Sequence, residues 1–291
     1  MFVNSGKELE KICSEEGISI CEYTLRSEEQ EGRDRNELIK SMRKVLNVMK
    51  ESSKKACEKE IKSISGLIGG DAVKLSEYSK SDNSFCGSFM VNVMARALSS
   101  SEVNAAMGKI VAAPTAGSCG ILPAVIISAC EKLKKDDDDI INALFTSSGI
   151  GILIAKNASL SGAEGGCQAE CGSAAAMGAA AAVEMAGGSP HMALDAAAIV
   201  IKNVLGLVCD PVAGLVEIPC AKRNVFGAVE SFIASDMVMS GIKSKIPFDD
   251  AVSAMNKVGR QMPCELKETA MGGLAATKTG LRLKDYVLKG C

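Results

Sequence analysis

The chain has 291 residues, of which 47% are hydrophobic and 3% aromatic, with 28 Gly and no Trp. This length and apolar content allow one large domain or two small ones with a sizeable buried core. The formal net charge of −2 argues against nucleic acid or an anionic membrane surface as the main partner.

The cysteine content places a limit on the compartment. The chain contains 12 Cys, but its first residues lack the pattern of a secretory signal. Many cysteines in a long chain without such a signal are typical of a cytoplasmic protein with reduced thiols. The longest apolar runs, Ile121–Cys130 and Ile141–Ala155, are shorter than the ~20 residues that span a bilayer. We therefore expect buried helices there and no membrane partner.

The first part of the chain is predicted to be helical and charged. Ser5 and Glu8 have capping-box spacing and open a short amphipathic helix that Gly17 ends. From about Glu28 to Ile64 the chain is charged, with apolar residues recurring at helical spacing, which predicts one long surface helix, possibly broken once. We expect residues 1–64 to form a charged helical segment, followed by a catalytic domain over residues 65–291.

Later predicted helices alternate with loops rich in glycine and proline. A helix is expected over residues 85–107, and Pro123 fits the first turn of the apolar run that comes next. Asp136–Asp139 suits a solvated loop at a helix start, and Ser189 with Pro190 suits an N-cap and first helical residue. No segment alternates convincingly with a period of two, so the predicted fold class is mainly α.

Three cysteines occur in glycine- or proline-rich settings beside predicted helix ends. They are Cys167, Cys209 and Cys220, which subtraction of their numbers places 42 and 11 residues apart. A helix is expected to end near Leu207, and another is expected to start just after Pro219. Thiolates are soft ligands that suit iron–sulfur clusters and zinc. Three thiolates on a cubane cluster leave one iron free to act as a Lewis acid, whereas four favour a closed site. On spacing alone, three ordinary buried cysteines are an equally good interpretation, and no C-x-x-C pattern occurs.

Longer motifs decide between these interpretations. The informative segments are AAPTAGSCGILP (112–123), GAEGGCQAE (162–170), GLVCDPVAGLVEIPCAKRN (206–224), SGLIGGD (65–71), NAAMG (104–108) and ETAMGGLA (268–275). From about residue 64 to the C-terminus, the chain resembles the alpha subunit of iron–sulfur L-serine dehydratase. The resemblance implies a helical domain with glycine-rich loops around a [4Fe–4S] cluster on Cys167, Cys209 and Cys220. It also implies β-elimination of L-serine to pyruvate and ammonia without pyridoxal phosphate, in serine catabolism that supplies gluconeogenesis.

The PTAGSCG loop and the residues after the third cysteine form the predicted substrate-binding region. Backbone N–H groups at Gly117 and the hydroxyls of Thr115 and Ser118 suit a carboxylate, and a helix N-cap with a tight turn explains the loop equally well. Arg223 suits a bidentate clamp on a carboxylate, or else it neutralises the anionic cluster. Asn224 follows it directly and is assigned to substrate binding.

Two further catalytic residues rest on the resemblance. It implies that Glu268 lies near the site. In some family members a C-terminal cysteine caps the open iron until substrate displaces it, and Cys291, the last residue, matches that pattern. The alternative for Cys291 is a frayed tail, which is the usual state of a terminus.

Two cysteines complicate the ligand assignment. Cys171 lies one helical turn after Cys167 and therefore shares its face, at a position where we expect the family to have an apolar residue. A fourth ligand from Cys171 would close the cluster, so we interpret it as a buried bystander. Cys119, in the substrate loop, is expected to line the pocket without binding iron.

The chain lacks an obvious general base. His191 is the only histidine, and its place in a predicted first helical turn favours a capping or surface role. The resemblance implies that a histidine-bearing part resides on a separate beta subunit. We therefore expect a hetero-oligomer whose alpha subunit turns over L-serine poorly when alone.

Two alternative functions follow from the same residues. A related iron–sulfur L-cysteine desulfidase would use the same open iron with a thiol leaving group. A non-catalytic protein would instead hold a closed cluster or a zinc ion in a structural, redox or sensing role. The wide spacing of the cysteines and the absence of C-x-x-C weigh against the non-catalytic alternative.

Overall fold

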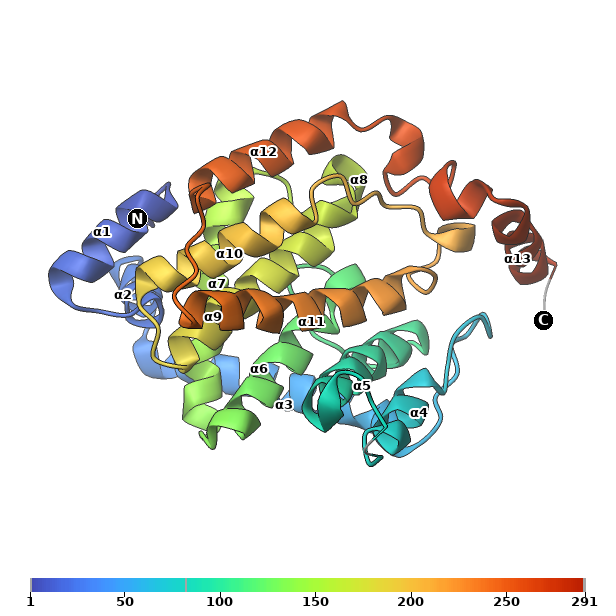
Figure 1. The fold of residues 1–291 in the computed structure, drawn as a ribbon, viewed down its shortest axis with the longest axis horizontal. Coiled ribbons are helices and arrows are strands. Elements are labelled where there is room, and N and C mark those ends of the chain that lie inside the picture. The colour runs from blue at the N-terminus through green and yellow to red at the C-terminus, as the bar shows by residue number, and fades with distance from the viewer. Residues whose placement is uncertain (1, 82, 290–291) are drawn as a thin grey trace.

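Helices account for the regular structure of this protein (Figure 1). A computed structural model describes residues 2–81 and 83–289, where the one β contact is an isolated bridge between Lys62 and Gly69. The α-helices are α1 (Gly6–Glu16), α2 (Ile20–Gln30), α3 (Arg35–Glu58), α4 (Asp71–Tyr78), α5 (Gly87–Ala105), α6 (Ile121–Leu133), α7 (Asp137–Asn157), α8 (Gly162–Gly165), α9 (Ser173–Met185), α10 (Pro190–Asn203), α11 (Cys220–Met239), α12 (Phe248–Gln261) and α13 (Lys278–Leu288). The predicted fold class, mainly α, is confirmed.

Short helical turns join several of these helices. A π-helical turn, η2 (Gln168–Gly172), runs directly into α9. Four 3-10 turns lie in the connections: η1 (Ala116–Ser118), η3 (Val212–Gly214), η4 (Cys264–Leu266) and η5 (Gly273–Ala276). The residues on which the candidate site depends are concentrated in these connections.

Capping residues set the helix ends that the sequence predicts most clearly. The side chain of Ser5 accepts a hydrogen bond from the backbone N–H of Glu8, and Gly17 ends α1 with φ of +64°, a left-handed conformation that suits glycine. Ser189 caps α10 and Pro190 is its first residue. The charged region after α1 forms two helices, α2 and α3, rather than one.

The centre of the fold is α9, whose sequence is rich in alanine. Helices α6, α7, α10 and α11 surround it, and nearly all of its residues are buried (Figure 1). Small residues allow close helix approach, and the hydroxyls of Ser231 and Ser235 on α11 donate hydrogen bonds to the carbonyls of Ala175 and Ala179 on α9. This packing holds the start of α9 and the start of α11 in a fixed relation, and both starts carry predicted cluster ligands.

The N-terminal helices share the core of the rest of the chain. Leu9, Ile20 and Leu46, from α1, α2 and α3, are fully buried in the hydrophobic cluster that contains α9. Glu184 at the end of α9 accepts hydrogen bonds from the backbone N–H groups of Ile20 and Cys21 at the start of α2. The division into residues 1–64 and 65–291 stays a prediction.

The described residues contain two helical segments long and apolar enough to cross a membrane by length and composition alone. They are Ala116–Leu133, which ends with α6, and Asp137–Asn157, which is α7. Of these windows, 72% and 67% are buried inside the fold. Most of each window therefore lies in the core, as predicted, although the helical segments are longer than the apolar runs on which that prediction relied.

Candidate active site

The three predicted cluster ligands lie at the ends of core elements and are buried. Cys167 begins the continuous helical segment that runs through η2 into α9, and Cys220 is the first residue of α11. Cys209 lies in the extended segment between α10 and α11. Helix α10 ends at Asn203, earlier than the expected end near Leu207. Because Cys167 and Cys220 each begin a helical segment, their thiols lie at helix N-termini, where a negative charge is stabilised.

The three thiols influence one another electrostatically, which places them in one neighbourhood. Burial raises the pKa of Cys209, and negative charge on Cys167 and Glu170 raises it further. Burial also raises the pKa of Cys220 to about 12, with Cys167 again contributing. Arg223 favours the thiolate form of Cys220, but burial and the charge of Cys167 outweigh it, so shared negative charge on the thiols is costly. A bound metal centre would remove that cost, because metal coordination deprotonates thiols.

Cys171 is in direct contact with a predicted ligand. Its sulfur lies 3.4 Å from the sulfur of Cys167, and both side chains are buried. A hydrogen bond between the pair lowers the pKa of Cys167 and raises that of Cys171. The shared helix face expected from the sequence is therefore confirmed, while the bystander role of Cys171 stays a prediction.

A buried ion pair holds the ligand loops together. The guanidinium of Arg223, on the first turn of α11, lies 2.8 Å from Oδ1 of Asp210 and also donates a hydrogen bond to the carbonyl of Val208. The other carboxylate oxygen of Asp210 accepts a 2.7 Å hydrogen bond from the backbone N–H of Leu274. Burial opposes charge on Arg223, but Cys167 and Asp210 outweigh it and raise the pKa of Arg223.

The predicted substrate loop is a 3-10 turn held from two sides. Thr115 and Ser118 form a capping box around η1. The side chain of Asn224 accepts a hydrogen bond from the backbone N–H of Gly120 at 2.8 Å and donates one to the carbonyl of Gly117 at 2.7 Å. The structure thus places Asn224 behind the loop, with both polar atoms of its side chain bound to backbone.

Glu170 connects the loop to the ligand cysteines. The hydroxyl of Thr115 donates a 2.9 Å hydrogen bond to Oε1 of Glu170, and the Cys209 sulfur lies 4.0 Å from Oε2. Burial raises the pKa of this carboxyl. The loop is close to it, since a Cβ at Gly117 would lie 3.2 Å from Oε1. Glu170 and Asp210 are not among the site residues predicted from the sequence, although each belongs to a motif that carries a predicted ligand.

An open cavity of about 460 Å³ adjoins this contact. Its lining includes Thr115, Gly117, Glu170 and Glu268, together with Ser161. Glu268 is exposed and belongs to the turn after η4. Ser118 is buried beneath the loop and Arg223 lies among the ligand segments, so the structure brings part of the predicted substrate set to the cavity wall.

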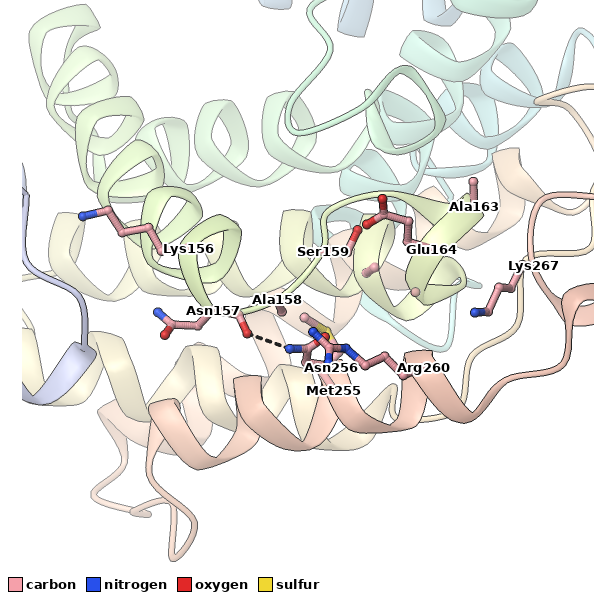
Figure 2. Close-up of a pocket in the computed structure, with 12 residues that line it drawn as sticks. Lys156, Asn157, Ala158, Ser159, Ala163, Glu164, Met255, Asn256, Arg260 and Lys267 are labelled. Carbon is pink, nitrogen blue, oxygen red and sulfur yellow. Dashed lines mark hydrogen bonds between the residues drawn. The ribbon is translucent and has the colours of Figure 1, made fainter.

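A second cavity of about 520 Å³ lies between the end of α7, α8 and α12 (Figure 2). Ser159 lines both cavities. Lys156 extends away from the other labelled side chains in Figure 2 and donates hydrogen bonds to the backbone carbonyls of Phe2 and Val3. None of the described site residues predicted from the sequence lines this cavity.

Two residues considered in the sequence analysis lie elsewhere or outside the described chain. Nδ1 of His191 is 3.0 Å from Glu10 on α1, and Nε2 is 3.5 Å from Asp195, at the N-terminal end of α10. His191 therefore bridges α10 and α1, away from the ligand cysteines. Cys291, the predicted resting-state cap, lies outside the described residues.

The donor set suits an iron–sulfur cluster better than a single ion. Within residues 2–81 and 83–289, no group of three or more His, Cys, Asp or Glu is arranged to hold one metal ion. A cluster contains several iron atoms, so its thiolates surround it and need not converge on one point. Three buried thiols with the nearby Arg223 cation match the needs of an anionic cluster, so the residues present fit such a group.

Comparison with known proteins agrees with this arrangement. The family model described as serine dehydratase alpha chain matches residues 15–275. A probable L-serine dehydratase alpha chain of Bacillus subtilis is 47% identical over all of this chain and 96% of its own length. The L-serine dehydratase alpha chain of Peptoniphilus asaccharolyticus is 48% identical over 99% of both chains.

One of the similar proteins is considerably longer than this chain. The L-serine dehydratase of Streptomyces coelicolor is 37% identical over 93% of this chain, which covers 60% of that relative. The family model and the two alpha chains each match most or all of this chain. The chain therefore belongs to the serine dehydratase alpha chain family.

Proposed function

We propose that this chain is the alpha chain of an L-serine dehydratase (L-serine ammonia-lyase), a carbon–nitrogen lyase that forms pyruvate and ammonia. The observation that carries the proposal is the bridge from Cys209 through Glu170 to Thr115. It joins a buried thiol neighbourhood to a loop and cavity of a size suited to a small amino acid. Full-length similarity to alpha chains that bear this name supports the same reaction.

We further propose that Cys167, Cys209 and Cys220 hold a [4Fe–4S] cluster. When bound, such a cluster supplies a Lewis acid that makes the serine hydroxyl a better leaving group. The protein contributes burial, which excludes water, and the Arg223 cation, which offsets the negative charge of the thiolates. Reduced thiols are required, and the described cysteines are free, which supports the proposal of a cytoplasmic enzyme.

In this proposal, the substrate loop binds the carboxylate of serine. Thr115 and Gly117 line the cavity that Glu170 also lines, and the hydroxyl of Thr115 is bonded to Glu170, so the backbone N–H groups of this loop are the proposed donors to the carboxylate. Asn224 fixes the loop from behind, so these donors are oriented before substrate binds. Arg223 is paired with Asp210, and its proposed contribution is charge compensation as well as attraction of a carboxylate.

Elimination removes the Cα proton and the Cβ hydroxyl of serine as water, and the resulting aminoacrylate rearranges and hydrolyses to pyruvate and ammonia. His191 lies on the α1 side of α10, so it does not serve as the base in this proposal. We assign the base to a beta chain, with which this chain forms a hetero-oligomer. If such a cluster is bound, the Cys291 thiol would be its resting-state cap in this proposal, and serine would replace that thiol.

The test is anaerobic co-purification of this chain with the beta chain, followed by iron analysis and assays of pyruvate formation. Serine-dependent pyruvate from the pair, with little from either chain alone, is the expected result. Faster pyruvate formation from cysteine than from serine would indicate a cysteine desulfidase. A stable cluster with no labile iron and no pyruvate would indicate a non-catalytic role.

A further inference from the structure

An apolar groove lies on the outer face of α11, next to the end of α10 and to α5. It encloses about 880 Å³, and its lining includes Met94, Leu205, Phe226, Val229, Glu230 and Ile233. Figure 1 shows α10 and α11 side by side with α5 on the other flank of α11, and these helices are in contact. We call this surface the α11 groove.

The apolar side chains of the α11 groove are unusually open to solvent. Phe226 is 78% exposed and Ile233 is 50% exposed, and both belong to a helix whose opposite face is packed on α9. Phe226, Val229 and Ile233 recur at helical spacing, so they form one continuous stripe. Contiguous exposed apolar surface of this kind marks an interaction site.

One acidic side chain lies inside this apolar surface. Glu230 is the sole charged residue among the described residues that line the α11 groove. Asn203 donates a hydrogen bond to it, and burial raises the pKa of its carboxyl to about 7. A carboxylate in an apolar groove without a cation favours a partner that brings one.

A second copy of this chain does not meet that requirement. A two-fold contact of groove on groove would oppose two carboxylates with no lysine or arginine from either lining. A contact between the groove and a different surface of a second copy would not close into a pair and would build chains or rings. A different polypeptide with an apolar face and one basic side chain satisfies both the apolar stripe and Glu230.

The α11 groove also adjoins segments that carry the predicted ligand cysteines. Gly206 and Leu207 line it, and the sequence reaches Cys209 two residues later. Gln168 is next to Cys167, and its side chain accepts a hydrogen bond from the backbone N–H of Gly206. The backbone N–H of Gln168 donates a hydrogen bond to the carbonyl of Leu207. A partner seated in the groove thus contacts the segments that position two of the ligand cysteines.

We propose that the α11 groove is the docking surface for the beta chain, which inserts an apolar helix face and places one basic side chain against Glu230. This inference rests on the proposed hetero-oligomer and specifies where its interface lies. Interface anchors of this type are aromatic side chains in desolvated settings, which assigns the central role to Phe226.

The experiment measures the dissociation constant of this chain and the beta chain, by titration under anaerobic conditions, for wild type and five variants. F226S and I233S are expected to weaken binding at least about tenfold. E230K, which repels a basic partner, is expected to weaken it more than E230Q. F85S is the matched control, because Phe85 is a fully exposed phenylalanine outside the groove lining. Circular dichroism confirms that each variant keeps its helix content.

Unchanged affinity for F226S and I233S, with wild-type association intact, would overturn the inference and leave the proposed function standing. An isolated chain that is dimeric, and becomes monomeric in F226S, would overturn it as well, since a second copy then covers the groove. Absence of any association between the wild-type chains would contradict both this inference and the hetero-oligomer on which it rests.

Discussion

The packing of α9 against α11 and the segments around the ligand cysteines are held by different kinds of contact. Between α9 and α11, alanine and glycine allow the helices to lie close, and the interhelical hydroxyl contacts of Ser231 and Ser235 go to carbonyls inside α9. Around the cysteines, Asn224, Asp210 and Thr115 bind backbone or side-chain groups of loops and short helical turns. The core is therefore expected to tolerate the loss of one polar contact, whereas the site is not.

The largest expected effect comes from the ligand cysteines. Replacing Cys167, Cys209 or Cys220 singly by Ser is expected to abolish the iron–sulfur absorbance of anaerobically prepared protein, because one ligand of a three-thiolate set is lost. Helix content should be unchanged, since α9 and α11 pack through other residues. Cys171→Ser is the control and is expected to keep the cluster. Full iron content after loss of one of the three would remove that residue from the ligand set.

The next effect separates loop fixation from core packing. Asn224→Ala leaves the buried backbone N–H of Gly120 and the partly buried carbonyl of Gly117 without their side-chain partner. We expect the free energy of unfolding to fall by about 2–3 kcal/mol, because a buried group loses its hydrogen bond without regaining water. Urea denaturation measures this, and an accompanying rise in KM for serine would show that the loop binds substrate. A change below the error of the measurement would contradict the fixation role.

Glu230 predicts a pH dependence of stability for the isolated chain. Its pKa rises to about 7 on folding because the groove desolvates the carboxylate. The folded state then binds more protons than the unfolded state between the ordinary pKa and 7, so this residue lowers stability as pH increases through that window. Glu230→Gln is expected to stabilise the chain at pH 8 by on the order of 1–2 kcal/mol and to change little at pH 4.

Thermal unfolding of wild type and Glu230→Gln across pH 4–8 tests that assignment. If Glu230→Gln changes the thermal stability equally at pH 4 and pH 8, the effect does not come from the titration of Glu230. Repeating the scan with the beta chain bound provides a second comparison. If the α11 groove is the interface, pairing with a basic side chain lowers the pKa of Glu230 and reduces its pH dependence.

The smallest expected effect lies in the core. The hydroxyl of Ser231 donates to the carbonyls of Ala175 and Gly227, both in helices. Because carbonyls inside a helix retain their main-chain partners, Ser231→Ala is expected to cost at most about 1 kcal/mol. Urea denaturation of this variant beside Asn224→Ala tests the contrast on a single helix, α11. Equal losses would show that the two regions do not differ in the way proposed.

Several local features of the fold were predictable because they depend on short-range chemistry. The cap at Ser5, the glycine stop at Gly17, the start of α10 at Ser189 and the start of α11 beside Pro219 all follow from neighbours within a few residues. The division of the charged region into α2 and α3 was left open, and Asp34 decides it by capping α3. The end of α10 was placed too late, because apolar residues continue past Asn203 into the α11 groove.

The candidate site was predictable in its residue types more than in their contacts. The motifs around Cys167, Cys209 and Cys220 identified the thiols, yet Thr115 pairs with Glu170 in a different motif, and Arg223 pairs with Asp210 from the opposite end of one long motif. The spacing of residues in the sequence does not predict such contacts. Glu170 had one available signal, its place three residues after Cys167 in the same motif, but a carboxylate there reads equally well as a helix surface residue.

The sequence by itself determined that the protein is helical, where several helices begin, and which family its motifs resemble. Capping, periodicity and motif order depend only on residues that are close in the sequence. Tertiary structure decided which thiols lie together, that Asn224 supports the substrate loop from behind, and that Phe226 faces outward beside Glu230. These relations arise from how α9, α10 and α11 pack. Side chains at the ends of separate helices become neighbours only when the core between those helices has formed.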